Sequence, residues 1–231
     1  MRRLLLWDID HTLIENSGVS KAIYAGAYCR LTSRAPTVPP ATEGKTDRLI
    51  MREMFESNEM PTPEWPDIQA ALQAAALDHQ DELREIGFVL PGVHEVLERL
   101  AGRGDVAQTI VTGNILENAI VKLSAFALDG LFDFRAGAYG SDSEDRHELV
   151  RLAKARSTRL YGVRFDARNT TVVGDTPRDI EAAHRGGARI VAVATGPDSE
   201  TQLRLSGADI VLPNLIDIER AINLMLDIEN P

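Results

Sequence analysis

Two carboxylates stand close together near the start of the chain, where Asp8 and Asp10 follow the apolar run Leu4–Trp7. Successive side chains of an extended strand alternate in direction, but a turn at the strand end can bring both carboxylates to one site. Paired acids of this kind serve proteins as nucleophiles, proton carriers and ligands for hard cations. A solvated turn with an aspartate that caps a helix is the alternative interpretation of this short motif.

A hydroxyl and a glycine follow a second apolar run, Ala107–Val111, in the sequence Thr112-Gly113-Asn114. Free backbone N–H groups at the start of a helix, together with a hydroxyl, form a cradle for an anion. The motif is therefore a candidate for binding an anionic group. Thr112 as an ordinary helix N-cap is the alternative.

A second acidic pair, Asp175 and Asp179, follows the apolar run Thr170–Val173. Asp175 is expected at the end of a strand, where open α/β sheets bind ligands. Asp179 falls in the first turn of the next helix, where the helix dipole alone already favours an acid. Arg146 opens an earlier helix, where a cation is unfavourable unless an anion lies nearby. A surface ion pair within the charged run 143–148 is the alternative for Arg146.

These residues need a framework that brings strand ends together, and the chain supplies an alternation of apolar runs and helical patterns. Each apolar run is followed by a polar or glycine-rich turn. The runs predicted as strands are Leu4–Trp7, Ala107–Val111, Thr170–Val173, Ile190–Ala194 and Asp209–Leu212. This alternation predicts an α/β fold with a Rossmann-like parallel sheet, whose strand ends carry the acids.

One segment, from about Ser20 to Ile86, breaks the alternation because it shows helical periodicity alone. Proline-rich linkers divide it into three predicted helices, around residues 22–31, 49–55 and 68–86. We therefore predict an α-helical cap subdomain, residues 17–87, inserted into an α/β core made of residues 1–16 and 88–231.

Composition narrows the classes of function. Lys and Arg number 25 and Asp and Glu 35, so the formal net charge is −10, which argues against nucleic-acid or anionic membrane partners. Aromatic residues make up 5%, which weakens any role in base stacking. Cys29 is the single cysteine, so an intrachain disulfide is excluded. The first apolar run ends at Asp8, too early for a signal peptide, and we expect a cytoplasmic protein.

Taken in order, the four motifs resemble those of the haloacid dehalogenase superfamily. Asp8-Ile9-Asp10-His11-Thr12 is similar to the nucleophile motif, Thr112 to the second motif, Arg146 to the third and Gly174–Asp179 to the fourth. A helical cap between the first two motifs, and the continuation through Gly186-Gly187-Ala188, resemble the phosphoglycolate phosphatase-like branch. The resemblance covers most of the chain.

Two positions depart from the family pattern. His11 stands where glycine is usual, and we expect its backbone N–H still to face a phosphate. Arg146 stands where lysine is more frequent, and arginine keeps the charge while adding a forked donor that suits phosphate.

The resemblance implies a role for each acid. Asp8 would attack phosphorus to form an aspartyl-phosphate, and Asp10 would act as general acid and then general base. Mg²⁺ would be held by Asp8, the backbone carbonyl of Asp10, and Asp175, while Asp179 would support the metal shell or orient Arg146. The groups expected to hold the phosphoryl oxygens are Thr112, Arg146 and the backbone N–H groups of Gly113 and Asn114.

The cap is expected to select the substrate. The loop 42–48 resembles the cap loop that reaches into the active site in this branch, and Lys45 would contact a substrate carboxylate or second phosphate. A helix start capped by Thr46 or Asp47 is the alternative.

The expected enzyme is thus a Mg²⁺-dependent phosphoric monoester hydrolase acting on a small phosphorylated metabolite, phosphoglycolate-like or a sugar phosphate. It is expected to be a monomer or homodimer. A phosphomutase of the β-phosphoglucomutase type shares all four motifs and stays open as the alternative. A 2-haloacid dehalogenase fits less well because Asp10 is superfluous there, and a phospho-receiver signalling module has no use for a cap.

Overall fold

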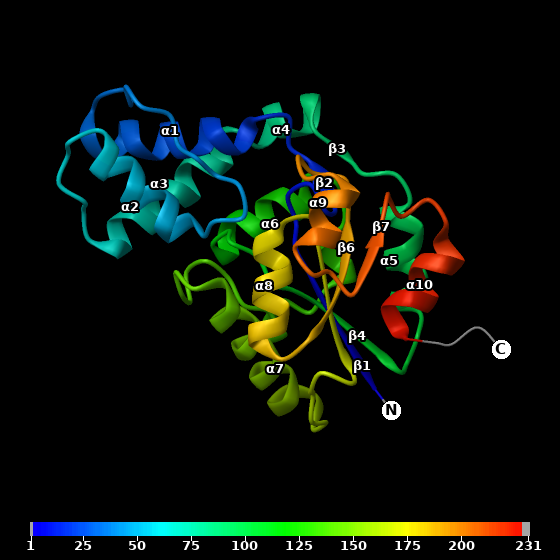
Figure 1. Cartoon of the computed structure of the whole chain (residues 1–231). Coiled ribbons are helices and arrows are strands. Elements are labelled where there is room, and N and C mark those ends of the chain that lie inside the picture. Colours follow the sequence, from blue (N-terminus) through cyan, green and yellow to red (C-terminus); the bar gives the residue numbers. More distant parts are fainter. Residues whose placement is uncertain (1, 228–231) are drawn as a thin grey trace.

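The computed structural model describes residues 2–227, and its centre is a parallel sheet in the order β4-β1-β5-β6-β7 (Figure 1). The strands of this sheet are β1 Arg3–Trp7, β4 Val106–Ile110, β5 Thr170–Gly174, β6 Arg189–Val193 and β7 Ile210–Leu212. They are the five predicted apolar runs, with ends displaced by a single residue. The predicted α/β fold with a Rossmann-like sheet is confirmed.

Both faces of the sheet are buried, which explains why its strands are continuous apolar runs. In β1, Leu4 and Leu6 pack with α7 and α8 on one face, whereas Leu5 and Trp7 pack with α5 and α10 on the other. The helices of this part are α5 Val93–Ala101, α6 Leu116–Ser124, α7 Arg146–Tyr161, α8 Pro177–Gly186, α9 Glu200–Leu205 and α10 Ile218–Leu226, with short 3₁₀ turns at Asp129–Leu131 and Phe134–Ala136. Within residues 2–227 no helix combines the length and the apolar character needed to cross a bilayer.

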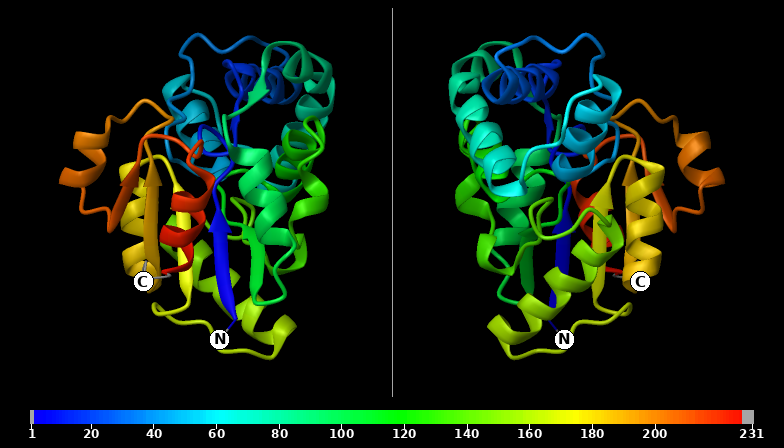
Figure 2. Two further views of the ribbon diagram at one scale, coloured as in Figure 1. Left: turned by 90° about the vertical axis from the view of Figure 1, so that its right-hand side faces the viewer. Right: turned by 90° about the vertical axis from the view of Figure 1, so that its left-hand side faces the viewer.

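A separate group of helices lies above the carboxyl ends of the strands (Figures 1 and 2). These helices are α1 Val19–Thr32, α2 Asp47–Ser57, α3 Trp65–Asp78 and α4 Gln80–Ile86. The single helix expected around 68–86 is in fact α3 and α4, because the helix ends at His79 and a new one begins. Apolar periodicity continues across this break, so the pattern does not reveal it. The apolar interior of the group extends onto α6 through Ile115 and Val121.

A two-stranded antiparallel sheet, absent from the sequence prediction, joins the entry and exit of this helical group. Its strands are β2 Ile14–Glu15 and β3 Phe88–Val89, with Ile14 paired to Val89. Runs of two residues are too short to show a strand periodicity. The segments that lead into and out of the helical group therefore run side by side. We propose the division into a core of residues 1–16 and 88–231 and a cap of residues 17–87.

Candidate active site

The loop after β1 carries the first acidic pair into one cavity. Asp8 continues the sheet, since its backbone N–H donates to the Val173 carbonyl at 2.9 Å. The chain then turns tightly over the Ile9 carbonyl, which accepts the backbone N–H groups of Thr12, Leu13 and Ile14. Because of this turn, Asp8 and Asp10 line the same cavity although they are only two residues apart.

His11 occupies the left-handed conformation at this turn, with a φ of 60°, which explains why glycine would be favoured there. Its backbone N–H donates to the Ile14 carbonyl at 2.7 Å, and its Nδ1 lies 2.8 Å from Glu15 Oε2. The expectation that this N–H faces a phosphate is therefore wrong, because the loop itself uses the donor.

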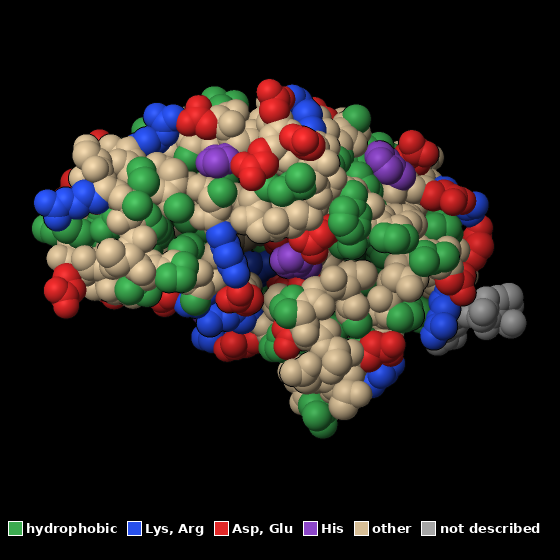
Figure 3. Space-filling view, turned by 90° about the horizontal axis from the view of Figure 1, so that it is seen from above, with side chains coloured by type: hydrophobic (Ala, Val, Ile, Leu, Met, Phe, Trp, Pro, Cys, Tyr) green, Lys and Arg blue, Asp and Glu red, His purple; other side chains and the backbone are tan. Residues whose placement is uncertain are grey.

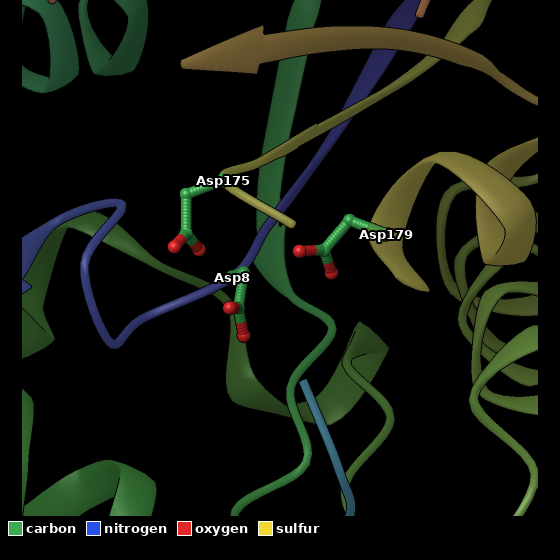
Figure 4. Close-up of side chains that lie close together, drawn as sticks. All are labelled: Asp8, Asp175 and Asp179. Atoms are coloured by element: carbon green, nitrogen blue, oxygen red, sulfur yellow. The ribbon is translucent and has the colours of Figure 1, made fainter. Parts of the chain in front are cut away.

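Three carboxylates converge where β1, β5 and α8 meet (Figure 4). Asp8, Asp175 and Asp179 each offer one oxygen, and these atoms lie within 4.8 Å of one another. Asp175 Oδ1 accepts the Thr12 hydroxyl at 3.2 Å, but its Oδ2 is buried and has no hydrogen-bond partner in the described part of the chain. Burial raises the pKa of Asp8 to about 6 and that of Asp175 well above its usual value, and neighbouring acids add to both.

This donor set fits a divalent cation. Hard oxygen ligands suit Mg²⁺, and an unpartnered buried carboxylate oxygen is costly unless a cation or a proton compensates it. Asp175 Oδ2 is the clearest candidate ligand because it has no hydrogen-bond partner among residues 2–227. Asp179 is less available: its Oδ2 accepts the Thr176 backbone N–H at 3.1 Å and the Thr176 hydroxyl at 2.7 Å in the capping box of α8.

Arg146, the first residue of α7, reaches the same acids. Its Nη2 lies 2.9 Å from Asp8 Oδ1 and 2.5 Å from Asp179 Oδ1, and the side chain is about nine-tenths buried. Burial alone would lower the pKa of Arg146, but Asp179 and Asp8 more than offset this and keep the pKa above its usual value. The structure thus puts a permanent positive charge beside Asp8, at the edge of the cavity, where it could bind an anionic group.

The motif Thr112-Gly113-Asn114 follows β4 and borders the same cavity. The Thr112 hydroxyl accepts from the Asn114 backbone N–H at 3.3 Å and from Asn114 Nδ2 at 2.9 Å. One of the two N–H groups expected to bind an anion, that of Asn114, is therefore engaged within the motif. Gly113 is required by packing, because a Cβ atom there would lie 2.1 Å from the Lys45 carbonyl.

Lys122 belongs to this site although the sequence analysis did not select it. It lies on α6 with 2% of its surface exposed, and its Nζ is 2.6 Å from Asp10 Oδ2 and 2.8 Å from Oδ1. Burial would raise the pKa of Asp10, but Lys122 and a hydrogen bond from Asn114 hold it lowered to about 2. A signal exists in hindsight: Asn114, Asn118 and Lys122 are spaced by four, and Asn118 and Lys122 lie on one face of α6 as buried polar residues.

The loop between α1 and α2 brings the cap onto the core. Asp47 donates its backbone N–H to the Gly113 carbonyl at 2.7 Å, and its carboxylate accepts the Ile115 backbone N–H at 2.8 Å and the Tyr24 hydroxyl at 2.6 Å. Lys45 lines the cavity, and its Nζ lies 2.5 Å from Glu53 Oε2 within the cap. The loop thus does contact the core site, while the charge of Lys45 already has a partner.

Every predicted site residue except Asp179 lines one cavity between the cap helices and the strand ends. Seen from above, the surface is hollowed there, and basic, acidic and histidine side chains gather around the hollow (Figure 3). Asp179 is buried beside the cavity, where it pairs with Arg146, which lines the cavity. Helix α1 and the loop between α1 and α2 contribute Ser20, Tyr24 and Lys45 to the lining.

A family model described as haloacid dehalogenase-like hydrolase matches residues 5–193, from β1 to the end of β6. This range contains all the acids and the arginine described above. The chain therefore belongs to the haloacid dehalogenase-like hydrolase family, and it is a hydrolase of that class.

Individual relatives agree with this assignment over the full length. "Probable phosphatase IndB" of Dickeya dadantii (strain 3937) is 25% identical over 238 residues, covering 100% of this chain and 97% of that protein. A hydrolase from Pseudomonas syringae has the same fold with a TM-score of 0.70 at 20% identity, covering 97% of this chain and 99% of the other. A Bacteroides vulgatus protein assigned as a beta-phosphoglucomutase follows with a TM-score of 0.66 at 18% identity, covering 97% and 90%. At these identities the solved structures support the fold alone.

Proposed function

We propose that this protein is a Mg²⁺-dependent phosphatase that hydrolyses a small phosphorylated metabolite, phosphoglycolate-like or a sugar phosphate, through an aspartyl-phosphate on Asp8. The observation that carries the proposal is the surroundings of Asp8, which pairs with Arg146 at 2.9 Å and lies beside Asp175 and Asp179. Asp10 faces the same cavity, so a nucleophile and a proton carrier lie at one phosphoryl site. The similarity to a named phosphatase along the whole chain supports the same activity.

In the first step, an Asp8 carboxylate oxygen forms a bond to phosphorus while the bond from phosphorus to the leaving oxygen breaks. Protonated Asp10 gives its proton to that oxygen. In the second step, Asp10 takes a proton from water as the water oxygen bonds to phosphorus, and the bond to Asp8 breaks to release phosphate. Arg146 and the Thr112 hydroxyl are positioned to hold the phosphoryl oxygens during both steps.

Asp8, Asp175 and the backbone carbonyl of Asp10 would hold the Mg²⁺ ion, which when bound neutralises charge on the phosphoryl group. The contacts of Asp179 with Arg146 and Thr176 support the role of orienting Arg146. A small molecule as the partner, a monomer or homodimer without nucleic acid or membrane, and a cytoplasmic location belong to the same proposal.

A phosphomutase of the β-phosphoglucomutase type is the second candidate, because it needs the same residues and two solved relatives carry that assignment. The two differ in the fate of the phosphorylated Asp8, which a mutase retains until a second hydroxyl takes the phosphoryl group. A 2-haloacid dehalogenase is disfavoured by the surroundings of Asp10, which receives hydrogen bonds from Asn16 at 2.8 Å and Asn114 at 2.9 Å besides its ion pair. Such a cradle has no purpose for an acid that the reaction does not use.

The deciding experiment measures phosphate release from 4-nitrophenyl phosphate with Mg²⁺ and with EDTA, followed by a screen of phosphorylated metabolites. We expect catalytic turnover with Mg²⁺ and its loss with EDTA. Release of a single equivalent that becomes catalytic only with a sugar bisphosphate would replace the phosphatase with the mutase. Metal-independent release of halide from a 2-haloacid, without phosphate release, would overturn both.

A further inference from the structure

Lys122 is a buried cation that none of the four motifs accounts for. Its side chain is 2% exposed on α6, and an ammonium group is costly to bury unless an anion and further acceptors surround it. The anion in contact is Asp10, whose own side chain is 24% exposed and opens into the cavity. The lysine therefore lies behind the acid, on the side away from the space where a substrate would bind.

The geometry around Lys122 is that of a fixed support. Its Nζ contacts both Asp10 oxygens, at 2.6 and 2.8 Å, which restrains the rotation of the carboxylate plane. The same Nζ donates to Asn114 Oδ1 at 2.7 Å and to the Ser20 hydroxyl of α1 at 2.8 Å. The three N–H groups of the ammonium group thus have acceptors from three separate segments: the Asp10 carboxylate, the Asn114 amide oxygen and the Ser20 hydroxyl.

We infer that Lys122 is a positioning residue for phosphoryl transfer: it fixes the Asp10 carboxylate where the leaving-group oxygen must be protonated. The inference rests on the proposed phosphatase function and extends it. Lys122 itself touches neither the substrate nor Asp8 in this role. Asn114 completes the support, because it bonds Asp10 through Nδ2 and Lys122 through Oδ1.

A displaced proton donor matters most when the leaving group is a strong base. 4-Nitrophenolate departs with little help, whereas phenolate needs the proton more, and the two aryl phosphates have nearly the same size. A misplacement of about 1 Å at a reacting group can cost about 100-fold. Removing Lys122 should therefore lower kcat/KM for phenyl phosphate about 10- to 100-fold more than for 4-nitrophenyl phosphate.

The experiment compares wild type, Lys122→Met and Lys122→Gln on both aryl phosphates with saturating Mg²⁺, using kcat/KM because it reports the phosphorylation of Asp8. The ratio of the two values is independent of the fraction of folded enzyme, so partial loss of stability does not affect it. Lys154→Met is the matched control, since Lys154 is a half-buried lysine that donates to the Gly186 and Gly187 carbonyls away from Asp10.

We expect a fall in the phenyl to 4-nitrophenyl ratio in both Lys122 variants and an unchanged ratio in Lys154→Met. If Lys122→Met does not fold, Lys122→Gln decides by the same ratio, since glutamine is polar enough for this buried position but is neutral and too short to hold both Asp10 oxygens. An unchanged ratio with both substrates slowed equally would make Lys122 a structural residue and overturn the inference while the phosphatase stands. Failure of the wild type to release phosphate from either ester with Mg²⁺ would overturn the proposed function, and the inference with it.

Discussion

Asp8 and Asp10 are the same residue type two positions apart, yet they lie in opposite surroundings. Around Asp8 stand two further acids, Asp175 and Asp179, with Arg146 as the cation in contact. Around Asp10 stand Lys122 and hydrogen-bond donors, with no acid in contact among the described residues. Burial raises the pKa of Asp8 to about 6, whereas Lys122 and Asn114 overcome burial and hold that of Asp10 near 2.

The difference teaches that neighbours, not residue type, divide the work between the two carboxylates. The Asp8 side has excess negative charge and gains stability when a cation binds. The negative charge of Asp10 is balanced by Lys122 in the free protein, so Asp10 is ionised there, as the proposed general-base step requires. In the proposed mechanism Asp10 must take up a proton before the acid step, and a bound phosphate group would favour this because its negative charge raises the pKa of a nearby carboxyl group.

The strongest test of this division is Asp8→Asn. Loss of the nucleophile should reduce turnover by at least about 10⁴-fold, because the asparagine amide cannot form the proposed acyl phosphate. The measurement is kcat on 4-nitrophenyl phosphate with Mg²⁺, with Asp105→Asn as a control because Asp105 is an exposed acid paired with Arg103. Activity within a few fold of wild type would remove Asp8 as the nucleophile.

The second test is Asp10→Asn, which deletes the proton carrier but leaves the nucleophile. We expect a loss of about 10²- to 10⁴-fold, smaller than for Asp8→Asn. The phosphorylated intermediate should still form on a substrate with a good leaving group, and mass spectrometry of the intact protein after rapid mixing would detect it. Equal, complete loss of phosphorylation in both variants would show that the two acids do not divide the reaction as proposed.

A third, smaller effect concerns selection by the cap rather than chemistry. Lys45→Ala should lower kcat/KM for the best substrate of the metabolite screen by about 10- to 150-fold, corresponding to about 1.5–3 kcal/mol for a lost charge-assisted hydrogen bond. Hydrolysis of 4-nitrophenyl phosphate should change little. Lys21→Ala is the control, because Lys21 is an exposed lysine of the same cap. Equal ratios for both substrates would remove Lys45 from the site and leave it as the partner of Glu53.

The smallest expected effect is on the free energy of unfolding in EDTA, to which Asp8 and Asp10 should contribute with opposite dependence on pH. The pKa of Asp8 rises from 3.8 to about 6 on folding, so the folded state binds the extra proton and stability falls as pH rises from about 4 to about 6. Asp8→Asn should reduce this fall by about 1–3 kcal/mol. The lowered pKa of Asp10 stabilises the fold above pH 4, so Asp10→Asn should instead lower the melting temperature at pH 7. Thermal unfolding from pH 4 to 7 checks both signs.

The fold and the acidic cluster were predictable because each strand of a parallel sheet leaves a local sequence pattern, a short continuous apolar run. Apolar runs ending in acids identify β1 and β5, and strand ends of one parallel sheet meet at one edge, which brings Asp8 and Asp175 together. Arg146 was predictable because a cation at a helix start needs an anion nearby, and Asp8 and Asp179 are those anions.

Lys122 was not predictable in the same way, because its role depends on how α6 is rotated beneath the cap. Flanked by Val121 and Leu123 in sequence, a lysine is normally expected to reach solvent. It is buried because Asp10, Asn114 and Ser20 arrive from other segments. The left-handed turn at His11 is likewise a consequence of the loop closing on Ile14, which no local pattern records.

The paired strands β2 and β3 have a consequence for how substrate selection can vary among proteins of this architecture. Ile14 and Val89 lie opposite each other in this antiparallel pair, so the chain leaves the core and returns to it at almost the same point. A segment anchored in this way is a closed loop whose entropic cost grows only with the logarithm of its length. Cap segments of very different size can therefore be exchanged between Ile14 and Val89 with little effect on the sheet. Such an exchange would change the residues that line the cavity from the cap side and leave the residues at the strand ends unchanged.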